Sequence, residues 1–259
     1  MKLPIFQLDA FASRQFGGNP AAVVVLPKWL PDETLQSIAQ ENNLAETAFV
    51  VPGKHAFDLR WFTPEVEMDL CGHATLASAH VMFNHGYTTE SEIVFRYQGG
   101  TLAVTRQQDL LAMDFPARPP TEIECDASVA KALGASPSEL HQSRDLLAVF
   151  DSQADVEKLR PDFAAVAKLD TFAVIASAPG QKCDFVSRFF APGAGIAEDP
   201  ATGSSHCTLV PYWSDRLGKS KLHALQLSRR EGEFFCESQG KRIKIAGRVL
   251  EYLQGEIYV

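Results

Sequence analysis

Short apolar runs separated by turn-forming residues recur through the first third of the chain. Most of them are rich in Val, Ile, Leu or Phe and are bounded by Gly, Pro, Asn or Asp, which is typical of β-strands. The runs lie at residues 21–26, 49–51, 59–62, 93–97 and 102–105. The pattern predicts a β-rich first half that contains few helices.

Two segments of this half have a helical pattern instead. One opens at Pro31-Asp32-Glu33, where Asp32 is expected to cap the helix and the early acids suit the helix dipole. Its Leu35 and Ile38 share one face, and we expect the helix to end near Asn42-Asn43. The other segment, residues 72–84, has small or apolar residues on almost every side. Such a helix is expected to be buried all round.

An internal repeat organises the chain. Residues 60–64, RWFTP, recur as residues 188–192, RFFAP, at an offset of 128. Three further pairs keep the same order: Gly72 with Gly203 at 131, residues 46–51 with 170–175 at 124, and residues 31–32 with 161–162 at 130. Four pairs in one order predict the duplication of a unit of about 130 residues. We therefore expect two similar halves that meet at one cleft.

A proline-rich segment, FPARPP at residues 115–120, marks the expected boundary, because proline disrupts strands and helices alike. The sequence predicts an N-terminal half at residues 1–116 and a C-terminal half at residues 117–248. The strand-like tail, residues 249–259, could return to pair with the first half.

Charge and composition exclude several classes of protein. The chain has 24 basic and 32 acidic residues, a net charge of −8, which repels phosphate backbones and anionic lipid. We therefore expect neither a nucleic acid nor a membrane partner. No run of 18 apolar residues occurs, and the N-terminus does not read as a signal peptide. Five scattered cysteines, never in a C-x-x-C pair, indicate reduced thiols and a cytoplasmic location.

Metal and nucleotide chemistry lack support in the sequence. The four residues Cys71, His73, His206 and Cys207 form two close pairs that match no zinc spacing, so no metal is expected. The glycine-rich nucleotide-binding motifs and the G-x-S-x-G elbow of serine hydrolases are also absent.

Two glycines place potential anion sites at helix starts. Gly72 opens the apolar helix, and Gly203 with Ser204 is expected to open its counterpart, so the first amides of each helix have no backbone acceptor. Two such helix ends would bind a small carboxylate from both sides. Glu46 precedes an apolar strand, where burial would favour proton transfer, although it could equally be a surface acid. Asp199 could cap the following helix, contact substrate, or do both.

Seven motifs together resemble one known family. They are DAF at 9–11, GNPAAVV at 18–24, NLAETAF at 43–49, FTP at 62–64, LCGHATL at 70–76, FAP at 190–192 and EDPATGS at 198–204. They resemble the PhzF-like phenazine-biosynthesis isomerase family, relatives of diaminopimelate epimerase. The resemblance implies an α+β fold of two pseudo-symmetric halves, each a curved sheet or barrel around a central helix, with a cofactor-free site in the cleft between them.

The resemblance also implies roles for individual residues. In the phenazine enzyme one glutamate takes a proton from carbon and returns it elsewhere on the substrate, and Glu46 matches this glutamate. His73 and Asp199 match its polar partners. The residues that match substrate-binding positions are Asn19, Gly72, Gly203 and Ser204. The family further implies a homodimer and a small-molecule carboxylate substrate.

Two other hypotheses stay open. The epimerase relatives use two facing cysteines, whereas this chain has Cys71 at the first position and Thr202 at the second. Cys71 could nevertheless serve as a one-thiol base in an amino-acid racemase or epimerase. Alternatively, the protein could bind a carboxylate on the same scaffold without turnover.

Overall fold

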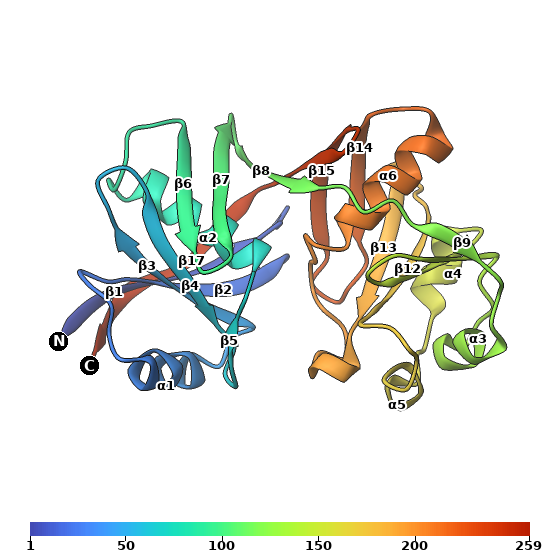
Figure 1. Ribbon diagram of the computed structural model, residues 1–259, viewed down its shortest axis with the longest axis horizontal. Helices are drawn as coiled ribbons and strands as arrows, with labels where there is room; N and C mark the ends of the chain where they lie inside the picture. The colour runs from blue at the N-terminus through green and yellow to red at the C-terminus, as the bar shows by residue number, and fades with distance from the viewer. The chain divides into compact units, whose positions relative to one another are not determined.

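The computed structural model describes all residues from 1 to 259, which fold into two units (Figure 1). Residues 1–114 and 246–259 form unit 1, and residues 115–245 form unit 2. The chain leaves unit 1 in strand β8 (Leu110–Pro116) and returns to it in strand β16 (Arg242–Gly247). The cleft expected between the halves stays a prediction.

Unit 1 is a mixed sheet with two helices. Its strands pair in the order β17–β1–β2–β3–β4–β6–β7–β8, and the short β5 also pairs with β4. Only β2–β3 and β4–β6 are parallel, because a helix connects the strands of each of these pairs. The elements are β1 (Lys2–Ala10), β2 (Asn19–Val25), α1 (Asp32–Asn42), β3 (Glu46–Pro52), β4 (Phe57–Phe62), β5 (Glu67–Met68), α2 (Gly72–Asn84), β6 (Glu92–Tyr97), β7 (Gly100–Gln107), β8 and β17 (Val249–Tyr258).

Helix α1 lies where the sequence predicts it, but its cap differs. Pro31 occupies the N-cap position and no side chain caps the helix, so the expected capping role of Asp32 is wrong. Asp32 instead accepts a hydrogen bond from Arg60 Nη1 at 2.8 Å. Asn43 ends the helix in the left-handed conformation, with φ 48°, which Asn tolerates better than most residues.

Helix α2 is the buried helix of unit 1. Every residue from His73 to Phe83 except His80 is buried, which confirms the expected burial on all sides. The helix contacts β1, β2, β3 and β17. Its small residues Ala74, Ala77 and Ala79 leave room for the strands to approach the helix backbone.

Unit 2 repeats this pattern of pairing. Its strands pair in the order β9–β10–β11–β12–β13–β14–β15, and only β11–β12 and β13–β14 are parallel. As in unit 1, helical segments connect the parallel strands. The elements are β9 (Thr121–Ile123), α3 (Ala127–Leu133), β10 (Glu139–Gln142), β11 (Leu146–Val149), α4 (Gln153–Lys158), α5 (Phe163–Val166), β12 (Val174–Pro179), β13 (Phe185–Phe190), η1 (Pro192–Ala194), α6 (His206–Leu217), β14 (Lys221–Gln226) and β15 (Gly232–Gln239).

Strand register corrects one pair of the sequence repeat. Phe49 of β3 lies opposite Arg60 of β4, and Ala176 of β12 lies opposite Arg188 of β13. Phe49 and Ala176 are 127 residues apart, which is within one residue of the offset of 128 between the arginines. The offset of 124 taken from residues 46–51 is therefore wrong by three residues. The sequence comparison matched the two segments in the wrong register, because short apolar runs resemble one another in more than one register.

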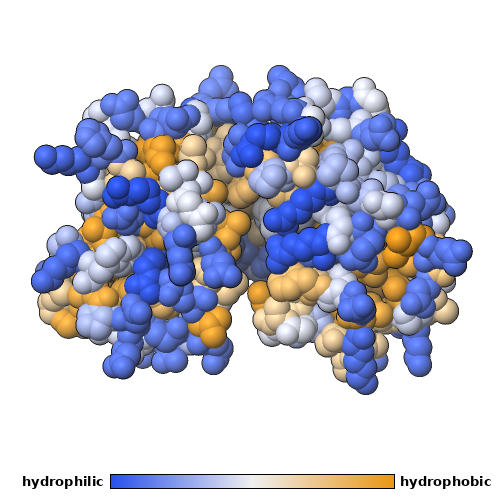
Figure 2. All heavy atoms as spheres, in the orientation of Figure 1, coloured by the Kyte–Doolittle hydropathy of each residue, from blue (hydrophilic) through white to orange (hydrophobic).

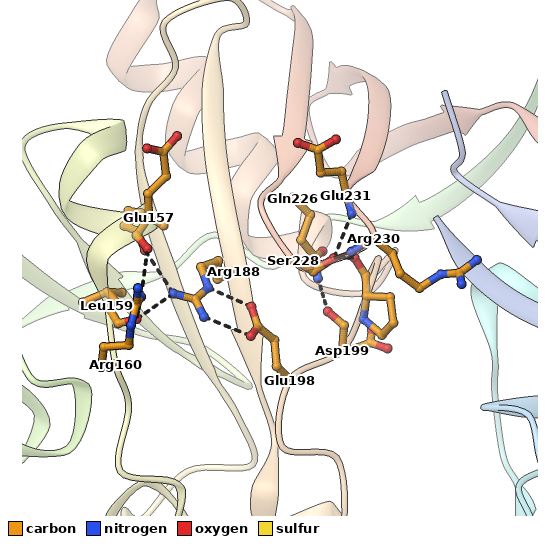
Figure 3. Close-up of polar contacts among 12 residues, drawn as sticks. Glu157, Leu159, Arg160, Arg188, Glu198, Asp199, Gln226, Ser228, Arg230 and Glu231 are labelled. Carbon is orange, nitrogen blue, oxygen red and sulfur yellow. Dashed lines mark hydrogen bonds and ion pairs between the residues drawn. The ribbon is translucent and has the colours of Figure 1, made fainter. Parts of the chain in front are cut away.

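The repeated arginine forms the same ion pair in both units. Arg60 Nε lies 2.6 Å from Glu67 Oε1, and Arg188 Nε lies 2.7 Å from Glu198 Oε1. The second carboxylate oxygen accepts from Nη2 in each case, as Figure 3 shows for Arg188 and Glu198. Each guanidinium also lies over the ring of the phenylalanine two residues later, Phe62 or Phe190. The repeat motif thus builds a structural cross-link.

Polar residues cover most of the face drawn in Figure 2, where apolar side chains form only small patches. Most of the largest apolar side chains are almost fully buried, among them Trp61, Trp213 and Phe190. Most of the large apolar residues therefore pack in the interior. No helix of the protein has the length and apolar character needed to cross a membrane.

Candidate active site

Three side chains of unit 1 meet at the start of α2. Glu46 is the first residue of β3, where it lies opposite Ala21 of the parallel strand β2. Cys71 is the N-cap residue of α2 in an extended conformation, and His73 lies in the first helical turn. The start of the strand and the start of the helix therefore bring Glu46 to two residues that lie 25 and 27 positions later in the chain.

His73 connects the other two side chains. His73 Nε2 lies 2.9 Å from Glu46 Oε2, and His73 Nδ1 lies 3.5 Å from Cys71 Sγ. The contact between His73 and Glu46 is an ion pair when the imidazole is protonated. The exposed fractions are only 7% for Glu46, 8% for His73 and 6% for Cys71. Each charge is therefore stronger in its effect on the others than it would be in water.

Burial and mutual charge set the protonation of this trio. Burial alone would lower the pKa of His73, but Cys71 and Glu46 outweigh it and raise the pKa well above its ordinary value. Burial, reinforced by the Glu46 charge, raises the pKa of the Cys71 thiol. The neighbouring groups therefore favour the protonated form of the His73 imidazole, whereas burial favours the neutral form of the Cys71 thiol.

The start of α2 adds a positive potential to the site. No side chain caps this end of the helix, so the amides of Gly72 and His73 have no acceptor within the helix. The Cys71 carbonyl is bound within the helix, by the Thr75 amide at 3.2 Å and the Thr75 hydroxyl at 2.6 Å. Free amides at a helix start favour an anion.

The trio also has the donor set of a metal site. The donor atoms of Glu46, Cys71 and His73 lie within 4.8 Å of one another, and sulfur, imidazole and carboxylate are all ligands that zinc accepts. The positive end of α2 opposes a cation at this point. The expectation of no metal stays a prediction.

Asn19 belongs to the same unit. It is the first residue of β2, lies opposite Ala10 of β1 and is fully buried. Its position in the β1–β2 pair buries this amide.

The site residues of unit 2 lie in the loop before α6. The Thr202 hydroxyl donates to Asp199 Oδ2, and the Asp199 amide donates to the Phe189 carbonyl at 3.0 Å. Asp199 does not cap α6, whose N-cap residue is Ser205. Gly203 and Ser204 follow Thr202 directly, so all four predicted residues of this unit lie within six positions.

Helix α6 starts later than the sequence predicts. The expectation that Gly203 opens it is wrong, because α6 begins at His206 and residues 203–205 form a turn. The His206 amide donates to the Gly203 carbonyl at 3.1 Å, a three-residue spacing typical of a tighter turn. The side chains of Ser205 and His206 both contact the Thr202 carbonyl, at 2.8 and 2.9 Å, which holds this turn in place.

His206 is a packing residue of unit 2. Its ring stacks on Phe234 with 3.9 Å between ring centroids, and it is fully buried. Burial lowers the pKa of His206 to about 4, so the ring is neutral at neutral pH.

Sequence reasoning missed Gln226, which contacts the same loop. Its side chain binds Asp199 and Thr202 through three hydrogen bonds. The residues at inward positions of β14 are Leu222, Ala224 and Gln226. A polar residue at the third inward position of an alternating strand is the signal that could have found it.

Comparison with known proteins identifies the family. A family model described as phenazine biosynthesis-like protein matches residues 8–255. An uncharacterized isomerase of Pseudomonas aeruginosa is 48% identical over 258 residues, which cover 99% of each chain. The chain belongs to the phenazine biosynthesis-like protein family. The resemblance seen in the sequence motifs is thereby confirmed, and the names of the relatives place the family among isomerases.

Solved structures confirm the fold class. A PhzF-family phenazine biosynthesis protein of Enterococcus faecalis has a TM-score of 0.98 at 46% identity, with 100% of both chains covered. A hydroxyproline epimerase from Agrobacterium vitis has a TM-score of 0.60 at 11% identity, over 99% of this chain and 92% of that chain. The latter likeness concerns the fold alone. The predicted α+β fold of the diaminopimelate epimerase-like type, with two similar halves, is therefore correct.

Proposed function

We propose that this member of the phenazine biosynthesis-like family is an isomerase or epimerase that moves a carbon-bound proton on a small carboxylate substrate. Glu46 acts as acid and base, and no cofactor takes part. The observation that supports this proposal best is the buried Glu46–His73 pair at the start of α2, with 2.9 Å between Oε2 and Nε2.

The chemistry follows from the charges of the pair. The Glu46 carboxylate takes a proton from a substrate carbon, and the C–H electron pair moves into the carboxyl or conjugated system of the substrate. The negative charge that develops is offset by the His73 imidazolium and by the free amides at the start of α2. Glu46 then returns the proton to another carbon, or to the other face of the same one. The protein is left unchanged, and no electrons are lost.

Unit 2 supplies further contacts in this proposal. Asp199 binds a polar group of the substrate or moves a proton with it, while the amides of Gly203 and Ser204 bind its carboxylate. Asn19 and Gly72 complete the substrate contacts from unit 1. These roles are supported by the motifs that match the family, and a single substitution at each residue can test its role.

Deuterium incorporation tests the proposal. Wild type and Glu46→Gln are incubated in heavy water with amino acids, hydroxy acids and dihydro-hydroxyanthranilate, and substrate masses are followed. We expect wild type to exchange at least one substrate and Glu46→Gln to lose about 10²–10⁴-fold in rate. Glu65→Gln, at an exposed acid in the turn between β4 and β5, is the matched control and should behave like wild type. Full activity of Glu46→Gln would show that another group is the base.

A second candidate function makes Cys71 the base of a racemase or epimerase. The 3.5 Å distance from Cys71 Sγ to His73 Nδ1 favours it, since a protonated imidazole so close to the sulfur stabilises a thiolate. The raised pKa of the thiol opposes it, because the thiolate is the reactive form. Loss of exchange in Cys71→Ser, with exchange retained in Glu46→Gln, would select this candidate.

A further inference from the structure

The loop that presents Asp199 is fastened to the neighbouring strand by one buried amide. Gln226, the last residue of β14, is fully buried. Its Oε1 accepts from the Thr202 amide at 2.8 Å, and its Nε2 donates to the Asp199 carbonyl at 2.7 Å. One side chain thereby binds both ends of the segment from Asp199 to Thr202, as Figure 3 shows for the Asp199 end.

A third bond of Gln226 orients the Asp199 carboxylate. Gln226 Nε2 also donates to Thr202 Oγ1 at 3.1 Å, and the Thr202 hydroxyl donates its own proton to Asp199 Oδ2. Because the hydroxyl has a single proton, accepting from Gln226 directs that proton to the carboxylate. The Gln226 side-chain amide therefore sets the direction of the hydrogen bond between Thr202 and Asp199, although it takes no part in that bond.

Ser228 reinforces the same attachment two residues later. Its hydroxyl donates to the Pro200 carbonyl at 2.7 Å. It also accepts from the amides of Arg230 and Glu231, residues that Figure 3 labels beside it. Alternating residues of one chain segment thus hold the middle and both ends of the Asp199 loop. Such a buried and satisfied polar network is costly to disturb at any member.

We infer that Gln226 is a positioning residue, whose side-chain amide fixes the Asp199 carboxylate and the amides of Gly203 and Ser204 in their working arrangement. The inference rests on the proposed function, in which Asp199 and these amides contact the substrate. Gln226 touches no reacting atom in this scheme. Its substitution acts through the loop, and the outer contacts that orient the ligands of metal sites, which act in a comparable way, contribute about 10–100-fold in activity.

Two variants separate positioning from folding. Gln226→Glu keeps the shape and the acceptor for the Thr202 amide but removes the donor to Asp199 and Thr202. Gln226→Leu removes all three hydrogen bonds at similar side-chain volume. If Gln226→Leu does not fold, Gln226→Glu alone carries the test. Ser177→Ala is the control, because Ser177 is equally buried in unit 2 and bonds Trp213 and Val186 without contacting the loop.

The measurements are substrate proton exchange, resolved into kcat and KM, and amide hydrogen exchange of residues 199–206 by mass spectrometry. We expect both Gln226 variants to lose about 10–100-fold in kcat and to raise KM, because the Gly203 and Ser204 amides that bind the substrate in the proposed function shift with the loop. Amide exchange in residues 199–206 should become at least about tenfold faster, while the strands of unit 2 keep their protection. Ser177→Ala should lower the melting temperature and leave kcat and this segment unchanged.

The outcomes distinguish this inference from the proposed function. A folded Gln226 variant with wild-type kcat, or with wild-type amide exchange in residues 199–206, overturns the positioning role. If wild type exchanges no substrate, the proposed function fails, and the amide exchange alone decides whether Gln226 fixes the loop. Faster amide exchange confined to residues 199–206 would then support the role of Gln226 in fixing the loop, and unchanged amide exchange would refute that role.

Discussion

Cys71 and Thr202 occupy equivalent positions in the two units, each directly before the repeated glycine and 131 residues apart. Cys71 Sγ lies beside the His73 ring, whereas the Thr202 hydroxyl donates to the Asp199 carboxylate. The ion pairs Arg60–Glu67 and Arg188–Glu198 support this equivalence, since their acids are also 131 residues apart. A two-thiol mechanism therefore has no second sulfur at the matching position.

This relationship predicts that Cys71 is dispensable for turnover. Cys71→Ser should keep proton exchange within about fivefold of wild type, because the proposed base is Glu46 and serine retains a polar side chain. Iodoacetamide should modify Cys71 slowly, since burial raises the pKa of its thiol. The exposed Cys125 is the internal reference for the rate of alkylation. Fast modification of Cys71 that abolishes exchange would instead favour the thiol mechanism.

The His73–Glu46 pair predicts a pH-dependent stability. The pKa of His73 is raised in the folded protein above its ordinary value of 6.5. Its contribution is therefore fully present below pH 6.5 and is lost as the pH rises through the raised folded value. The difference in free energy of unfolding between wild type and His73→Asn, measured by urea denaturation, should shrink above pH 6.5. A difference that is constant from pH 5 to pH 9 would contradict the raised pKa.

The two repeated arginines predict unequal losses of stability. Side-chain exposure is 12% for Arg188 and 24% for Arg60, and Arg188 also donates to the carbonyls of Val156 and Leu159. Replacing Arg188 by Met should cost about 3 kcal/mol, because it leaves Glu198 partly buried without its partner.

The same change at Arg60 should cost about 1 kcal/mol, because its partners are more exposed. Urea denaturation of both variants checks the order. Equal losses would show that the cation–π contacts with Phe62 and Phe190, which the two units share, dominate instead.

Gly232 predicts a close contact under the Asp199 loop. A Cβ at this position would lie 2.6 Å from the Ala201 Cβ and 2.9 Å from Phe234. Gly232→Ala should therefore cost about 1–3 kcal/mol and disturb residues 199–202. Gly240→Ala is a poor control, because Gly240 has a positive φ of 73°, whereas Gly193→Ala meets nothing within 4 Å and has no such constraint. Thermal unfolding should separate Gly232→Ala from Gly193→Ala by several degrees.

Much of the local structure was readable from the sequence alone. The small and apolar residues on almost every side of residues 72–84 predicted a buried helix with the observed limits, and the repeated RWFTP and RFFAP segments indicated the duplication. The buried helix depends on neighbouring residues, and the duplication leaves two copies in the same order. Both features can therefore be recognised in one sequence. The family followed from motifs spread over almost its whole length, and it carried the fold with it.

Three features were beyond the sequence because they depend on contacts between distant segments. The start of α6 moved to His206 because side chains of Ser205 and His206 bind the Thr202 carbonyl and tighten the preceding turn. The register of β12 followed from pairing with β13, which no run of apolar residues specifies. The cap of α1 changed because Arg60, 28 residues away, binds Asp32.

The candidate site divides in the same way. The sequence by itself determined the residue types and the family motifs that nominate Glu46, His73 and Asp199. Only the tertiary structure brought Glu46 Oε2 within 2.9 Å of His73 and placed Gln226 beneath the Asp199 loop. The physical reason is that charge coupling and hydrogen-bond direction depend on distances of a few ångströms between side chains, and the chain folds residues far apart in sequence to those distances.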